Sequence, residues 1–238
     1  DRGHFSVENK PQYWGNSGGL EYEAAWALGA DTGINDLDAL TFANFLCNED
    51  GFDPITFGAT VAAAMELYDL GVITKEQTGG VDFSFGNAAA LAKAAELVAT
   101  GEGFGKDLGL GSKRLCEKYG HPDLSMTVKG QEFAAYDGRG MQGMGLAYAT
   151  SNRGACHLRA DPYGHDFETT DTPGKARVVA ESQRDVAFID SSGLCLFPGG
   201  CGWTMDDYRE LVNAACQGDW DSQLTGERIW NLEKLYNL

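Results

Sequence analysis

The 238-residue sequence lacks a long hydrophobic stretch and a leader-like start. No run reaches the roughly 18 apolar residues needed for a membrane span, and no basic segment with a cleavage-site pattern opens the chain. Basic residues are few: 18 Lys and Arg stand against 35 Asp and Glu, a formal net charge of −17. We therefore expect no membrane span and no nucleic-acid partner, and the acidic balance is typical of a cytoplasmic enzyme.

Cysteine pairs with metal-binding spacing are also missing. The six cysteines include no C-x-x-C pair, so the chain does not encode a self-contained zinc site or a complete iron–sulfur motif. Their number is too small for a disulfide scaffold of this length. We expect most of them to be buried free thiols in a reducing compartment.

Strand patterns are scarce, whereas helical patterns recur along the chain. Only residues 124–136 alternate loosely in the manner of a strand or hairpin. Residues 1–20 and 161–174 are expected to be loops because Gly, Pro and polar residues dominate them. Helices are predicted over residues 21–28, 36–50, 54–70, 87–99, 106–119 and 175–189. A further helix is predicted to end at residue 150, and the last two are predicted to begin at about residues 204 and 225. The chain is predicted to be mainly α.

One turn motif occurs twice, each time at the end of a predicted helix. The first copy is Asn48-Glu49-Asp50-Gly51-Phe52-Asp53, and the second is Asp190-Ser191-Ser192-Gly193-Leu194-Cys195. In each copy the glycine suits the left-handed backbone position that follows a helix. An ordinary helix cap explains either copy alone. Two copies in one helical chain suggest a pseudo-symmetric pair that grips one ligand.

Three further stretches could carry chemistry. Residues 151–159 place His157 next to Arg159, a proton donor beside a group that binds planar anions, although a surface turn is an equal alternative. Glu23 is either a solvated first-turn residue or a buried general base. The glycine-rich residues 136–145 would allow a bulky ligand close to the backbone, or form a flexible linker.

Four motifs together resemble the tungsten-containing aldehyde ferredoxin oxidoreductase family. They are Glu21-Tyr22-Glu23, Gly33 to Ala39, Ala149 to Arg159 and Asp190 to Cys195. The resemblance covers nearly the whole chain and implies the two packed helical domains of that family, over residues 1–130 and 131–238. The family's N-terminal β domain and a final segment are expected to lie outside this chain, which is taken as a piece of a longer protein.

The resemblance implies two cofactors, a tungsten–bispyranopterin (tungstopterin) and a [4Fe-4S] cluster. Cys195 would be one cluster ligand, and the other three would come from a cysteine motif that this chain does not contain. Asn48 stands where the family usually has Asp, so that pterin contact is expected to be altered. The residues implied to contact the pterins are Asn48, Asp53, Arg159, Asp190 and Leu194.

Glu23 and His157 match the two proton-handling residues of the family. The implied reaction oxidises an aldehyde to a carboxylic acid and passes electrons through the cluster to ferredoxin or an electron-transfer subunit, in an anaerobic cytoplasm and in a homo- or hetero-oligomer. Two alternatives stay open. One is a tungsten reductase of aromatic acyl thioesters, weakly disfavoured because residues 24–46 contain neither His nor Cys. The other is a helical assembly domain without cofactor.

Overall fold

The computed structural model describes residues 10–13 and 19–238, and the chain divides into two compact units. The first unit comprises residues Asp1–Ala135 and the second comprises Tyr136–Leu238. The loop expected at residues 1–20 lies mostly outside the described part. The match between these units and the domains expected over 1–130 and 131–238 stays a prediction.

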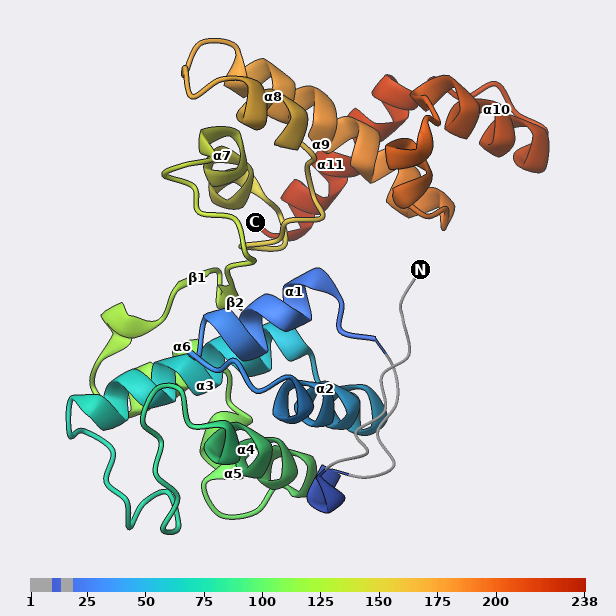
Figure 1. Cartoon of the computed structure of the whole chain (residues 1–238). Helices are drawn as coiled ribbons and strands as arrows, with labels where there is room; N and C mark the ends of the chain where they lie inside the picture. Colours follow the sequence, from blue (N-terminus) through green and yellow to red (C-terminus); the bar gives the residue numbers. More distant parts are fainter. Residues whose placement is uncertain (1–9, 14–18) are drawn as a thin grey trace. The chain divides into compact units, whose positions relative to one another are not determined.

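The first unit is helical apart from one small hairpin (Figure 1). Its strands pair antiparallel, with Thr127 opposite Glu132 and Val128 opposite Gln131. Its elements are η1 (Pro11–Tyr13), α1 (Tyr22–Ala25), η2 (Trp26–Ala30), α2 (Leu37–Asp50), α3 (Pro54–Asp69), α4 (Ala88–Thr100), α5 (Gly105–Leu108), α6 (Ser112–Lys118), η3 (Pro122–Leu124), β1 (Thr127–Val128) and β2 (Gln131–Glu132).

The second unit contains only helices and loops among its described elements. These are α7 (Gln142–Thr150), α8 (Tyr163–Glu168), α9 (Lys175–Ser192), η4 (Phe197–Cys201), α10 (Met205–Cys216) and α11 (Ser222–Tyr236). The prediction of a mainly α fold is therefore confirmed. Within the described residues, no helix is both long and apolar enough to cross a membrane.

Side chains at the helix starts explain several of the boundaries. Asp36 accepts hydrogen bonds from the backbone N–H groups of Asp38 and Ala39 and so begins α2. Asn87 begins α4 in the same way. Thr204 and Asp207 form the capping box expected at the start of α10. These caps satisfy donors that have no partner within the helix, which is why the predicted starts agree with the observed ones.

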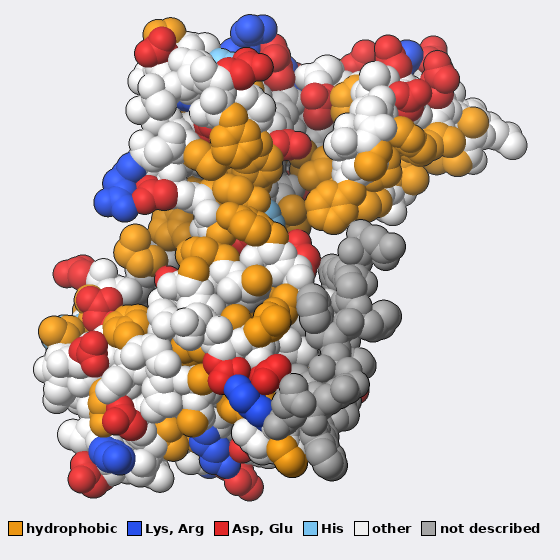
Figure 2. All heavy atoms as spheres, in the orientation of Figure 1, with side chains coloured by type: hydrophobic (Ala, Val, Ile, Leu, Met, Phe, Trp, Pro, Cys, Tyr) orange, Lys and Arg blue, Asp and Glu red, His pale blue; other side chains and the backbone are white. Residues whose placement is uncertain are grey.

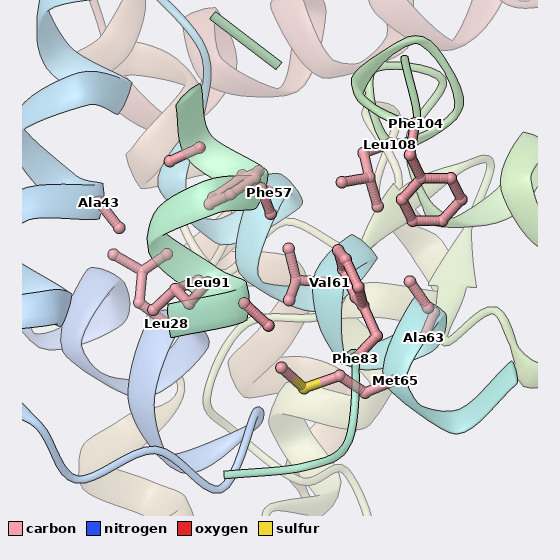
Figure 3. Packing of buried hydrophobic residues seen from close by; sticks show 14 of the residues in the cluster. Leu28, Ala43, Phe57, Val61, Ala63, Met65, Phe83, Leu91, Phe104 and Leu108 are labelled. Atoms are coloured by element: carbon pink, nitrogen blue, oxygen red, sulfur yellow. The ribbon is translucent and has the colours of Figure 1, made fainter. Parts of the chain in front are cut away.

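The core of the first unit gathers around α3 (Figure 3). Val61 and Met65 of α3 are fully buried and share one apolar cluster with Leu28 and Leu91. Gly58 lets α3 approach the turn η2 closely, since a Cβ atom there would lie 2.4 Å from the carbonyl carbon of Ala27. Any side chain at this position would force the two elements apart.

The predicted helix over residues 21–28 is only partly α-helical. The chain is α-helical over Tyr22–Ala25 and continues as the five-residue π-helical turn η2. The N–H of Asp31 donates to the carbonyl of Trp26 at 3.0 Å, which is the longer π-type repeat. The hydroxyl of Thr32 donates to the carbonyl of Leu28 at 2.6 Å and helps to end the turn.

Two other predictions about helices are wrong. The single helix expected over residues 106–119 is broken into α5 and α6, because Gly111 adopts a φ of +81°. The loop expected over 161–174 contains the short helix α8.

Helices α9 and α11 pack along each other in the second unit (Figure 1). Gly226 of α11 permits this contact, because a Cβ atom at this position would lie 2.0 Å from the carbonyl oxygen of Arg184 in α9. Apolar side chains stay at the surface around α10 (Figure 2), among them Leu211, Trp203 and Trp220.

Candidate functional site

Both copies of the turn motif end a helix at a left-handed glycine, as the sequence predicts. Gly51 follows α2 and Gly193 follows α9, and each has a φ of +76°. No atom lies within 4 Å of the place where a Cβ atom would stand on either glycine. The backbone angle rather than crowding therefore calls for glycine at both sites. One copy lies in each unit, and their joint action on one ligand stays a prediction.

The second turn belongs to a charge cluster around Arg159. Its NH1 group donates to Oδ2 of Asp190 at 2.9 Å, and its NH2 group donates to Oε1 of Glu233. The Arg159 side chain is only 7% exposed, whereas those of Asp190 and Glu233 are 40% and 36% exposed. One buried cation thus joins the end of α9 to α11.

One hydrogen-bond donor of Arg159 is unused within the described residues. This donor is Nε, which is buried and has no hydrogen-bond partner there. Burial lowers the pKa of Arg159. The hydrogen bond and charge of Glu233, and to a smaller extent those of Asp190, outweigh burial, so the pKa lies above its usual value. The side chain therefore stays a cation that can hold an acceptor-rich ligand such as a pterin or a phosphate.

His157 lies in the irregular segment 151–159 and is half-buried against two tyrosines. Its ring centroid is 6.0 Å from that of Tyr136, and the Tyr136 ring is 4.7 Å from Tyr163. The hydroxyl of Tyr163 donates to the backbone carbonyl of His157 at 3.1 Å. Since the histidine packs against other residues on one side, the alternative of a plain surface turn does not describe this segment.

Glu23 is a buried carboxylate in the first unit. It is 2% exposed on α1, and its Oε2 accepts the backbone N–H of Ala135 at 2.9 Å. The alternative of a solvated first-turn residue is therefore wrong. A buried carboxylate within hydrogen-bond reach of its neighbours suits proton transfer, and that role stays a prediction.

Asn48 and Asp53 flank the first turn and are both exposed. Asn48 donates its amide to the carbonyl of Asn44 at 2.9 Å, which leaves its oxygen as an acceptor. Asp53 begins α3 by accepting the N–H of Thr56 at 2.9 Å. Asn48 in the last turn of α2 and Asp53 at the start of α3 thus place two oxygen acceptors on either side of Gly51.

Cys195 is exposed directly after the second turn, next to the half-buried Leu194. The buried hydroxyl of Tyr208 on α10 fixes this loop: it lies 3.1 Å from the carbonyl oxygens of Cys195 and Leu196 and accepts the N–H of Gly199 at 3.0 Å. The described part of the chain contains no group of three or more His, Cys, Asp or Glu residues placed to hold a metal ion.

All six cysteines are free thiols, as expected, but only three of them are buried, so the expectation that most would be buried is not met. Cys47, Cys116 and Cys156 are buried, whereas Cys201 and Cys216 are exposed like Cys195. Burial raises the pKa of Cys116 to about 11, so that thiol stays protonated at neutral pH. The three exposed thiols all lie in the second unit.

The glycine-rich residues 136–145 serve contacts inside the protein. A Cβ atom on Gly138 would lie 2.7 Å from the Cα of Gly145, and one on Gly143 would lie 2.7 Å from Asp166 Oδ1. Asp166 accepts the N–H groups that begin α7 and pairs with the buried Lys175 at 2.5 Å. The sequence predicts that these glycines let a ligand approach the backbone. At Gly138 and Gly143 it is instead another part of the chain that approaches.

The residues that hold the site were not identified from the sequence. Glu233, Tyr208 and Tyr163 stand in ordinary helical contexts, and the partners of Glu233 and Asp166 lie far from them in sequence.

Both units of the chain are mainly helical in their described parts, and each copy of the turn motif ends a helix at a left-handed glycine. The family model described as aldehyde ferredoxin oxidoreductase, domains 2 and 3, matches residues 3–238, and this chain belongs to that family.

Curated relatives agree with this assignment. The chain is 47% identical to a tungsten-containing aldehyde ferredoxin oxidoreductase of Pyrococcus furiosus over 261 aligned positions, which cover 98% of this chain and 43% of the relative. It is 43% identical to the protein of the same name from Thermococcus kodakarensis, over 97% of this chain and 40% of the relative. A WOR-like subunit of an aliphatic sulfonate oxidoreductase from Pyrococcus furiosus is 28% identical over 74% of this chain. The chain thus spans about two fifths of the length of these two tungsten-containing relatives.

Proposed function

We propose that this chain forms the helical part of an enzyme that oxidises aldehydes to carboxylic acids at a tungsten–bispyranopterin centre. Electrons would leave through a [4Fe-4S] cluster to ferredoxin or a similar acceptor in the cytoplasm. The proposal rests on family membership and on the names of relatives that are 43–47% identical. Because the chain spans only part of those relatives, the activity is proposed for the whole protein.

The single structural observation that carries the proposal is the Arg159–Asp190 pair at the left-handed turn. Asp190 is an exposed carboxylate of which only Oδ2 is engaged by Arg159, and Arg159 retains a buried Nε donor. Pterin rings present N–H donors and ring acceptors along one edge, which match a carboxylate and a guanidinium. We assign Asp190, Arg159 and the backbone at Leu194 to one pterin, and Asn48 and Asp53 to the other.

The bound centre would supply the two-electron oxidation of the carbonyl carbon. Within the chain, His157 would donate a hydrogen bond to the aldehyde oxygen, where negative charge develops. Glu23 would accept a proton from water, since it is a buried carboxylate held in place by the backbone N–H of Ala135. Tyr136 lies against the ring of His157 on one side, and the hydroxyl of Tyr163 binds the backbone carbonyl of His157.

Cys195 is proposed as a ligand of the iron–sulfur cluster, with the remaining ligands supplied from outside this chain. The thiol is exposed, and Tyr208 holds its carbonyl at a fixed place. Cys201 is also exposed and lies in the next turn, η4, so it provides a matched control. Cys195→Ser should alter the EPR signal of the cluster in the full-length protein, whereas Cys201→Ser should leave that signal unchanged.

Tungsten and iron analysis of the full-length protein tests the proposal as a whole. We expect both metals to be present, and we expect Glu23→Gln and His157→Asn to abolish aldehyde oxidation while the metal content stays at the wild-type level. Absence of both metals from the full-length protein would refute the proposal. Full activity of both variants would refute the assigned proton-handling roles.

A further inference from the structure

The segment 151–159 that carries His157 and Arg159 contains no helix or strand. Within it, one backbone hydrogen bond joins the N–H of Cys156 to the carbonyl of Gly154 at 2.7 Å. Buried backbone and polar groups need partners, so the shape of such a segment depends on side chains from other elements. Those side chains are therefore candidates for positioning residues.

Helix α11 supplies most of these partners, and Glu233 is at their centre. One carboxylate oxygen of Glu233 accepts from Arg159 and the other accepts from the Asn152 amide at 3.3 Å. The carbonyl of Trp230 also accepts from that amide at 3.0 Å, and Asn237 donates to the carbonyl of Asn152 at 2.8 Å. A single carboxylate thus holds both ends of the segment.

Glu233 also determines how Arg159 meets Asp190. The two carboxylates engage different nitrogens of the guanidinium, NH2 for Glu233 and NH1 for Asp190. A guanidinium that faces one carboxylate alone favours a fork in which both carboxylate oxygens are used. In the structure Glu233 engages Nη2 of Arg159 and Asp190 engages Nη1 through its Oδ2, so Oδ1 of Asp190 remains an acceptor for a ligand.

We propose that Glu233 is a positioning residue of the cofactor site. It would keep Asp190 singly bonded to Arg159 and would fix the segment that carries His157. This inference rests on the proposed function, since the ligand for Asp190 is the pterin proposed above. Without the Glu233 charge, Arg159 would turn onto Asp190, and the acceptor Oδ1 would be lost to the pterin.

Two matched substitutions on α11 test the proposal. Glu233→Gln removes the charge at nearly constant shape. Glu227→Gln removes the charge of another Glu on the same helix, which pairs with Arg184 of α9 at 3.5 Å and is likewise partly exposed. The first measurement is NMR of the Arg side-chain N–H groups and the His rings in the 238-residue chain. The second is the tungsten and pterin content of the full-length protein.

Glu233→Gln should shift the Arg159 and His157 signals and lower the cofactor content about tenfold, the size typical for lost outer partners of a metal site. Glu227→Gln should change neither. Unchanged Arg159 and His157 signals would overturn the proposal, as would equal cofactor loss in both variants. A general loss of helix signal in Glu233→Gln would make the residue merely structural and would also overturn it.

Failure of the proposed function would look different from failure of this inference. If the wild-type full-length protein contained no tungsten, the proposed function would fall. The NMR comparison would still decide whether Glu233 holds the segment.

Discussion

Replacing Lys175 by Met should destabilise the second unit strongly, because it leaves a buried carboxylate without its cation. Lys175 donates to Asp166 Oδ1 at 2.5 Å, with side chains that are 4% and 0% exposed. Methionine keeps most of the apolar length of lysine but carries no charge. The two N–H groups at the start of α7, which donate to Asp166 at 3.0 and 2.8 Å, would be the remaining partners of the carboxylate.

The expected loss at pH 7 is about 3 kcal/mol of the free energy of unfolding. Removing one member of a buried pair costs roughly 3–5 kcal/mol, and the two remaining N–H donors place the value at the lower end. Burial raises the pKa of Asp166, but the bond from Lys175 and the two N–H donors outweigh it, so the pKa lies below its usual value. That stabilisation is present above the unfolded pKa of about 3.9 and is lost as the pH falls through the folded pKa.

Urea unfolding of the 238-residue chain, followed by far-UV circular dichroism at pH 7 and at pH 3, measures the loss in the free energy of unfolding and its dependence on pH. The loss in Lys175→Met should be smaller at pH 3, because Asp166 without its lysine takes up a proton more readily as the pH falls and then carries no unpaired charge. Arg177→Met is the matched control on the same helix, since Arg177 pairs with Glu181 at 3.3 Å in largely exposed positions. It should cost less than about 0.5 kcal/mol. A loss below about 1 kcal/mol for Lys175→Met, or a loss independent of pH, would refute the reasoning.

Three smaller changes give further checks. Burial raises the pKa of Asp31 to about 6, so its charge opposes folding increasingly as the pH rises from about 4 to 6. Asp31→Asn should therefore increase the free energy of unfolding by about 1–3 kcal/mol at pH 7 and change it little at pH 4, as measured by urea unfolding. Tyr163→Phe removes the donor to the His157 carbonyl and should cost about 1 kcal/mol, with faster amide exchange in that segment. Gly58→Ala should lower the melting temperature by crowding Ala27, at a cost of about 1–3 kcal/mol; an unchanged value would contradict that close packing.

The capped turns could be predicted from the sequence because their causes are local. A glycine that follows a helix adopts the left-handed conformation at little cost because it has no Cβ atom, and both Gly51 and Gly193 do so. A polar residue at a helix start finds its N–H partners within three positions, as Asp36 and Asn87 show. Local rules were thus sufficient for the helix ends that flank the candidate site.

The cluster around Arg159 could not be predicted in the same way. Its two carboxylate partners lie 31 and 74 positions away in sequence, and no periodic pattern connects them. The turn η2 was missed for a different reason: its composition is that of an ordinary helix, and tertiary packing against Gly58 decides the form of the repeat. Fold class and turn type therefore follow from the sequence, whereas the residues that fix the site follow from contacts between distant helices.

The π-helical turn after Glu23 determines which change in length this segment tolerates. A π turn takes up one residue more than an α-helical turn while the parts before and after it keep nearly the same phase. Deleting one residue between Trp26 and Ala30 should therefore give a continuous α-helix that still directs the carboxylate of Glu23 toward Ala135. Deleting one residue from an α-helix without such a turn would instead rotate the part before it by about 100° relative to the part after it.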